Sequence, residues 1–98
     1  MNSISKDFLF IPIQVRYCNG LPPNAKILFG EIASRANEEN KAIFHYDEFP
    51  ELFGVNKKAV YLWISALEKE GFLKSRMIRK QKEHYHIFLL TTGITSPG

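Results

Sequence analysis

The feature that most constrains this chain is a pair of helical patterns that meet at a glycine. In the first pattern the apolar residues Phe49, Leu52 and Phe53 recur at i, i+3 and i+4, and Asp47 is a candidate N-cap. Gly54 follows at once, where the end of a helix requires a residue that tolerates positive φ. The glycine therefore predicts the end of one helix and a tight turn before the next.

The second pattern begins at Asn56, which occupies an N-cap position, and ends at Gly71. Apolar residues at helical spacing form one face of it: Val60, Trp63, Ile64 and Leu67. Two helices across a tight turn predict a helix-turn-helix, whose second helix can enter a DNA major groove. Many small α domains also contain such a pair, so the pair alone leaves DNA binding open.

After Gly71 the periodicity changes from helical to alternating. Residues 72–78 and 84–90 read as strands, and the charged segment 79–83 connects them. In the second strand one face carries Tyr85, Ile87 and Leu89, and the other carries His84, His86, Phe88 and Leu90. A hairpin directly after a helix-turn-helix is a wing, so the chain predicts an α+β fold, the winged helix-turn-helix. We expect three helices, a C-terminal β-hairpin wing and a short N-terminal strand or arm.

The N-terminal strand or arm is predicted over residues 8–15, which are apolar and rich in β-forming residues. Pro12 cannot donate a ladder hydrogen bond, so an edge strand or an extended arm is expected rather than a central strand. An apolar edge can pair with a second chain, or the arm can fold back on its own domain. Both alternatives are compatible with these residues.

A further helix is predicted from residues 21–24, because proline is tolerated in a first turn. Gly30 within it is unfavourable by about 1 kcal/mol relative to alanine and suggests a close approach of another element. Glu31 and Arg35 are spaced as a favourable i,i+4 pair. Residues 42–46 predict a short strand before the helix-turn-helix. The apolar face of the helix consists of Ala25, Leu28, Phe29, Ile32, Ala33 and Ala36.

The 98 residues suit one domain, which we place at residues 8–90, with a flexible N-terminus over 1–7 and a flexible tail over 91–98. Cys18 is the single cysteine, so no intramolecular disulfide and no cysteine-based metal site can form. No stretch reaches the roughly 18 apolar residues of a membrane span, and no basic leader precedes an apolar run. These features predict a cytoplasmic protein without membrane partners.

Charge is unevenly distributed along the chain. Residues 1–54 carry five basic and seven acidic side chains, whereas residues 55–98 carry eight basic and three acidic side chains. Such asymmetry favours a polyanion-facing side in the second half, although a solvated face of lysines has the same composition. Two lysines in the first turn of a helix oppose the helix dipole by a few tenths of a kcal/mol, which suggests compensation by an anion.

The predicted DNA contacts come from both parts of this second half. The second helix offers its first turn to the major groove, and the wing offers its cations to the backbone or the minor groove. A solubilising hairpin tip is the alternative for the wing. The predicted residues are Asn56, Lys57, Lys58, Tyr61 and Ser65 of the helix, and Lys74, Arg76, Arg79, Lys80 and Lys82 of the wing.

Motifs of enzyme chemistry are absent from the sequence. There is no Gly-rich phosphate loop, no Gly-x-Ser-x-Gly and no His-Glu-x-x-His. His84 and His86 alternate beside Glu83 but have no third firm ligand, and His45 reads as a cross-strand or surface histidine. Cys18 lacks a basic neighbour and reads as an inert thiol. We therefore predict no metal, no cofactor and no enzymatic activity.

Four segments of the chain carry a resemblance to a known family: Pro12–Ile13, 21–32, 53–64 and 67–73. Together they resemble the winged-helix domains of phage and plasmid replication initiators of Gram-positive bacteria. The resemblance covers roughly residues 10–90. Its most particular part is Leu-Pro-Pro-Asn-Ala-Lys, while the later segments are shared by many bacterial winged helices. Initiators usually carry a further C-terminal domain, whereas this sequence ends at Gly98, as an excised domain or a small protein of a mobile element would.

The resemblance implies a non-catalytic protein that binds double-stranded origin DNA in the replication of a plasmid, phage or other mobile element, often as a homodimer through its N-terminal region. Two alternatives share the fold. One is a transcriptional regulator, which would need a palindromic operator near its own gene. The other is a protein-interaction module that docks a replisome protein, for which the basic surface would be incidental.

Overall fold

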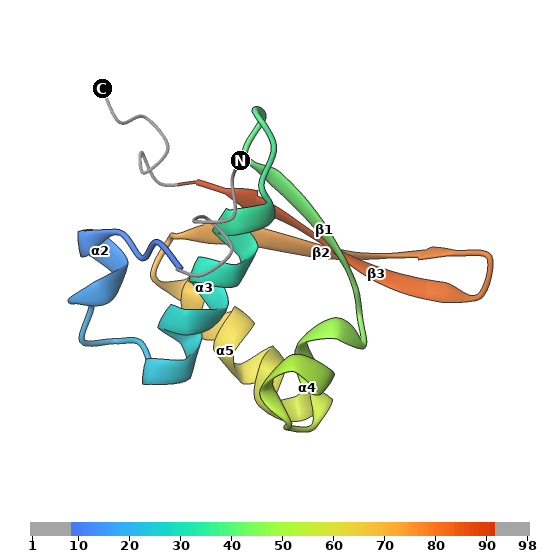
Figure 1. The fold of residues 1–98 in the computed structure, drawn as a ribbon, viewed down its shortest axis with the longest axis horizontal. Coiled ribbons are helices and arrows are strands. Elements are labelled where there is room, and N and C mark those ends of the chain that lie inside the picture. Colours follow the sequence, from blue (N-terminus) through green and yellow to red (C-terminus); the bar gives the residue numbers. More distant parts are fainter. Residues whose placement is uncertain (1–8, 92–98) are drawn as a thin grey trace.

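The computed structural model describes residues 9–91, which form four helices and one three-stranded antiparallel sheet (Figure 1). The predicted α+β winged helix-turn-helix is confirmed. No helix in this part of the chain is long and apolar enough to cross a membrane. The elements in chain order are α2 (Ile13–Arg16), α3 (Pro23–Arg35), β1 (Lys41–His45), α4 (Glu48–Phe53), α5 (Lys57–Lys69), β2 (Leu73–Lys80) and β3 (Glu83–Leu90).

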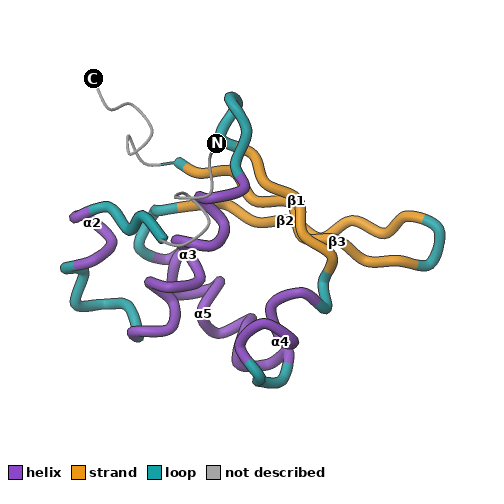
Figure 2. Tube along the Cα trace, viewed as in Figure 1, coloured by secondary structure: helices purple, strands orange, loops and turns teal. Residues whose placement is uncertain are grey.

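The sheet has the order β1-β3-β2, so β3 is its central strand. β1 pairs with residues 85–89 of β3, and β2 pairs with β3 along its whole length, from Leu73 opposite Leu90 to Lys80 opposite Glu83. The hairpin of β2 and β3 therefore continues past the end of β1 and protrudes from the body of the protein (Figure 2). This protruding hairpin is the wing.

The core lies between the helices and one face of the sheet, which we call the inner face. The apolar face predicted for α5 is buried, and Phe29 of α3 packs edge-on against Phe72, with ring centroids 6.2 Å apart. An aromatic cluster joins β1, α4 and β3 through Phe44, Phe49 and Phe88. Because α5 buries one whole face in this core, its opposite face is held rigidly toward solvent.

The helix ends around the turn follow the sequence closely, with one exception. Gly54 and Gly71 adopt φ of 67° and 83°, and the Asn56 side chain accepts a hydrogen bond of 2.9 Å from the backbone N–H of Ala59. Asp47 occupies the N-cap position of α4, but the prediction that it caps the helix is wrong. Its ψ of −9° is helical rather than extended, and its side chain makes no capping hydrogen bond.

The prediction of a strand or extended arm over 8–15 is wrong for residues 13–15, which belong to α2. Pro12 takes the N-cap position with φ of −60°, and its carbonyl accepts the N–H of Arg16 at 2.8 Å. Proline has no N–H to donate to a neighbouring strand, whereas its fixed φ suits the start of a helix. The residues after Pro12 therefore form a helix rather than a strand. Phe8 lies outside the described residues.

The segment before α2 folds back on its own domain, which is one of the two arrangements predicted for the N-terminal arm. Ile11 packs against the core, and Leu9 lies beside Gly30 of α3. A Cβ at position 30 would lie 3.2 Å from Ile11 Cγ1 and 3.3 Å from Leu9 Cβ. The predicted close approach at Gly30 is thus confirmed, and the approaching element is the N-terminal segment.

The wing turn is shorter than the sequence predicted. Instead of the connection 79–83, only Gln81 and Lys82 connect the strands, with φ of 52° and 73°. Two consecutive residues at positive φ form a primed turn, whose twist matches that of an antiparallel pair. Arg79, Lys80 and Glu83 consequently have strand geometry, so alternation decides on which face of the wing each one lies.

Candidate nucleic-acid interface

The solvent face of α5 is the centre of the candidate interface. The predicted residues Lys57, Lys58, Tyr61 and Ser65 are all exposed on it, and Asn56 caps its start. This position follows from the burial of the other face, since a helix with one apolar stripe presents its polar residues away from the core. The first turn of α5 is therefore free to approach a nucleic acid.

Lys57 is held by groups of its own domain. Its Nζ lies 3.8 Å from the ring centroid of Tyr46 and 3.6 Å from Oδ1 of Asp47. Contact with the Tyr46 side chain, followed by the charge of Asp47, raises the pKa of Lys57 above its ordinary value. The anion that compensates a lysine at this helix end is thus Asp47, the residue predicted from the sequence to cap α4.

Lys58 differs from Lys57 in its surroundings. Within residues 9–91, no acidic side chain lies within ion-pair distance of Lys58. An exposed lysine in the first turn that forms no ion pair adds its positive charge to the positive end of the helix dipole. Lys58 is therefore better placed than Lys57 to attract a phosphate.

An exposed row on α5, which we call the α5 stripe, begins at Lys58 and includes one residue that the sequence analysis missed. Residues spaced by four, three and four positions lie on one side of a helix. Lys69 has this spacing from Lys58 and is exposed, so the spacing was the signal that could have identified it. The α5 stripe consists of Lys58, Leu62, Ser65 and Lys69.

Aromatic contacts connect α5 to the inner face of the wing. The ring of Tyr61 meets His86 of β3 edge-on, with centroids 5.8 Å apart, and Tyr46 meets His84 in the same way at 5.3 Å. His86 is buried and stacks on Phe88. Burial lowers the pKa of His86, so this histidine is neutral at pH 7. Its contact with Tyr61 is therefore a packing contact between two rings rather than an interaction with a charged imidazolium.

The register of the wing divides its predicted cations between two faces. Arg79 is opposite His84, so it lies on the inner face, the same side as Tyr46 and Lys57. Three other cations point to the opposite face, which we call the outer face: Lys74, Arg76 and Lys80. Lys82 lies in the turn at the tip. The structure thus brings Arg79 to the side of α5 and separates three of the predicted residues from it.

His45 joins the end of β1 to the start of β3. Its Nε2 contacts Oε1 of Glu83, and its ring meets Tyr85 edge-on at 5.4 Å. The predicted cross-strand role of His45 is confirmed. The hydrogen bond with Glu83 is the largest cause of a raised pKa at His45, and the charges of Glu83, Asp47 and Glu48 act in the same direction.

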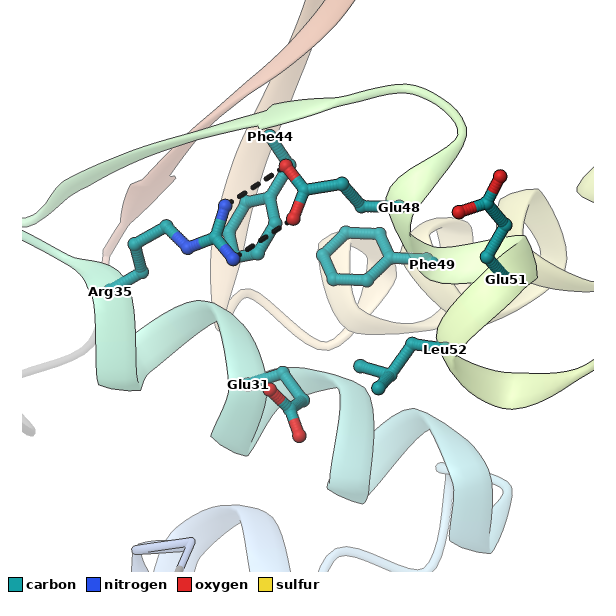
Figure 3. Close-up of a pocket in the computed structure, with 7 residues that line it drawn as sticks. All are labelled: Glu31, Arg35, Phe44, Glu48, Phe49, Glu51 and Leu52. Carbon is teal, nitrogen blue, oxygen red and sulfur yellow. Dashed lines mark hydrogen bonds and ion pairs between the residues drawn. The ribbon is translucent and has the colours of Figure 1, made fainter. Parts of the chain in front are cut away.

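An ion pair connects the first residue of α4 to the last residue of α3. Arg35 contacts Glu48 through both ends of its guanidinium, with Nη2–Oε1 at 2.9 Å and Nη1–Oε2 at 3.0 Å, and lies 3.8 Å above the ring centroid of Phe44 (Figure 3). The ion pairs of the described residues thus assign Arg35 to Glu48, rather than to Glu31 as the sequence predicted. This pairing lowers the pKa of Glu48, which also accepts the N–H of His45. The start of the helix-turn-helix is thereby fixed to α3 and β1.

Among residues 9–91, no three His, Cys, Asp or Glu side chains come together in a way that could hold a metal ion. Cys18 is partly buried against the core. The groups gathered at the interface are instead cations, aromatic rings and a hydroxyl. These groups can bind phosphates and the edges of bases.

Comparison with known proteins agrees with this geometry. The model of the helix-turn-helix domain family matches residues 19–73, more than half of the chain, from the turn before α3 to the first residue of β2. No curated protein and no solved structure matches the chain. The chain belongs to the helix-turn-helix domain family.

Proposed function

We propose that this protein binds double-stranded DNA without catalysing a reaction, with α5 in the major groove and the wing against the backbone. The observation that carries the proposal is the exposed, cationic first turn of α5. Lys58 projects there without an acidic neighbour among the described residues, while Tyr61 is braced by His86. A helix-turn-helix presents this same end of its second helix to base edges.

The inner face of the wing extends the proposed surface. Arg79 lies on the same side as Lys57, and Lys82 is at the protruding tip. A duplex bound to α5 would contact these two cations before the cations on the outer face of the wing. Lys74, Arg76 and Lys80 were predicted from sequence to contact DNA, and their place on the outer face makes that contact a separate question for mutagenesis.

The biological role that we propose is replication of a plasmid, phage or other mobile element through binding of origin DNA in the cytoplasm. The support for this role is the sequence resemblance to replication initiators, strongest in residues 21–26. A transcriptional regulator is equally compatible with the helix-turn-helix family. Mapping the bound sites distinguishes them, because a regulator would protect a palindrome near its own gene and an initiator would protect origin DNA.

A homodimer is part of the proposal, and apolar side chains near α2 support it. Phe10, Ile13 and Tyr17 are 76%, 64% and 70% exposed. Exposed apolar groups of this size are a frequent mark of a protein interface. Sedimentation of the intact chain should show a dimer that the triple substitution Phe10→Ser, Ile13→Ser and Tyr17→Ser converts to a monomer. A monomer at every concentration of the intact chain would rule the dimer out.

The DNA proposal is tested by fluorescence anisotropy with a pool of labelled duplexes at two salt concentrations. Intact protein should bind with an affinity that falls steeply with salt, since released counterions drive phosphate contacts. The double substitution Lys57→Ala and Lys58→Ala should remove most of this affinity. The matched control is the double substitution Lys26→Ala and Lys41→Ala, which also removes two positive charges but outside α5. This variant should retain most of the affinity for duplex.

Two outcomes would contradict the proposal. If intact protein does not bind duplex at low salt, the fold serves another purpose, and docking of a replisome protein becomes the leading alternative. If both double variants lose affinity equally, net charge rather than α5 is responsible for binding. Circular dichroism of each variant verifies that the loss does not come from unfolding.

A further inference from the structure

The outer face of the sheet departs from what an antiparallel sheet with a solvated side usually shows. Such a face normally carries polar side chains, which gives alternating strands. Here the central strand β3 buries Phe88 and Leu90 on its inner face and also carries apolar side chains on the outer one, namely Tyr85, Ile87 and Leu89. Since a strand that is apolar on both faces is built for burial on both, the outer face of β3 has the composition of a covered surface.

No described helix covers this outer face, because α3, α4 and α5 lie on the other side of the sheet (Figure 1). Ile43 of β1, opposite Ile87, is 54% exposed, and Leu89 is 38% exposed. These side chains line up across the strands in register. Ile78 of β2, opposite Tyr85, lies on the same face. We call this set of apolar side chains the outer apolar strip: Ile43, Ile78, Tyr85, Ile87 and Leu89.

Cations flank the outer apolar strip along both sides. Lys41 of β1 and Lys74 of β2 are both opposite Leu89, and Arg76 of β2 is opposite Ile87. Lys80 continues the row toward the tip. Glu83 is the acidic side chain on this face of the described sheet, and it is already in contact with His45. The surface is thus an apolar centre with a positive rim.

The shape and charge of this surface select among possible occupants. Single-stranded nucleic acid stacks its bases on flat aromatic rings, whereas the strip is mainly aliphatic and the one tyrosine is half-buried. A second copy seated on the same face would bring two positive rims together. The terminal segments, 1–8 and 92–98, contain one acidic residue between them, Asp7. A partner with apolar side chains between acidic ones matches both properties of the surface.

We propose that the outer face of the sheet docks an acidic amphipathic helix of a partner protein. The strip extends over five residues of β3, or about 14 Å, which is the length of two to three helical turns. The apolar side of such a helix would lie on Ile43, Ile87 and Leu89, and its carboxylates would reach Lys41 on one side and Lys74 and Arg76 on the other. This surface lies on the opposite face of the sheet from α5 and Arg79, so the same molecule can hold DNA on the inner side and the partner on the outer side.

The test uses a fluorescent peptide of about 16 residues, long enough to form a helix when bound, with leucines on one face and glutamates beside them. Two control peptides replace the glutamates by lysines or the leucines by serines. Intact protein should bind the acidic leucine peptide at least tenfold more tightly than either control. The substitutions Lys41→Glu and Ile43→Ser should each weaken this binding severalfold and leave duplex binding unchanged.

Other results would overturn the proposal. Equal binding of the peptide by intact protein and the Ile43→Ser variant would show that the peptide is held elsewhere. No binding of any peptide would exclude an acidic helix as the occupant. Preference for a labelled single-stranded oligonucleotide, or a change of oligomeric state on Ile43→Ser alone, would assign the face to nucleic acid or to a second copy. Because duplex binding is measured in parallel, failure of this proposal is distinct from failure of the DNA proposal.

Discussion

The ammonium group of Lys57 lies 3.8 Å from the ring centroid of Tyr46. It also lies 3.6 Å from Oδ1 of Asp47, the residue that follows Tyr46 in the chain. These two residues form the turn between β1 and α4, so the turn that precedes the helix-turn-helix partly neutralises the first turn of its second helix. Lys58 has no such restraint within the described residues. Two adjacent lysines thus have different electrostatic surroundings.

Lys58→Ala should therefore weaken duplex binding more than Lys57→Ala. Loss of one phosphate contact lowers the salt slope of the affinity by about 1, and we expect this change for Lys58→Ala and a smaller one for Lys57→Ala. Anisotropy titrations over a range of salt measure both slopes. Asp47→Asn is the informative control, because it should increase the contribution of Lys57. A larger loss for Lys57→Ala in the unchanged background would contradict this interpretation.

Substitutions in the wing should distinguish its two faces. Arg79→Ala should weaken duplex binding by roughly 1 kcal/mol and lower the salt slope, since Arg79 lies on the side of α5. Arg76→Ala removes the same charge from the outer face and should have a clearly smaller effect on duplex affinity. Equal losses would mean that the duplex contacts both faces of the wing, as the sequence alone predicted.

Asn56→Ala should destabilise the protein by about 1 kcal/mol, because it removes the hydrogen bond from the Ala59 N–H at the start of α5. Urea denaturation measures the loss. Asn56→Asp keeps an acceptor oxygen and should retain most of the stability. If the aspartate variant were as unstable as the alanine variant, the amide would have a role other than capping.

Stability should decrease as pH rises above about 6.5, the ordinary pKa of histidine. Glu83 raises the pKa of His45, so the folded protein holds this proton more tightly than the unfolded chain does. That contribution is complete below the unfolded pKa and is lost as pH rises through the folded one. Denaturation midpoints between about pH 6 and pH 9 should show a steeper decline for intact protein than for Glu83→Gln.

His86 acts in a different pH range and with the opposite sign. Burial lowers its pKa, so the unfolded chain binds a proton more readily than the folded protein as pH falls below about 6.5. His86→Gln should reduce the loss of stability on acidification without changing the decline above neutral pH. A profile in which the two variants affect the same range would show that the histidines titrate as a coupled pair.

Local sequence signals were sufficient to predict the helix-turn-helix and the turn between its helices. Gly54, Asn56 and Gly71 have local requirements, positive φ or a capping oxygen, that hold wherever the helices pack. The apolar periodicity of α5 and the alternation of β3 also predicted which of their faces would be buried. Each of these properties depends on residues a few positions apart, which is why they can be read without the structure.

The tertiary structure decided the partners of the charged residues. Arg35 had Glu31 at a favourable spacing, yet it pairs with Glu48, which the fold brings within 2.9 Å although it lies 13 positions further along the chain. Asp47 was taken for a cap and became the partner of Lys57, and the register of the wing put Arg76 and Arg79 on opposite faces. Such pairings depend on distances between segments that are remote in sequence. Because an exposed charge gains little free energy from any one partner, its spacing along the chain does not predict the residue with which it will pair.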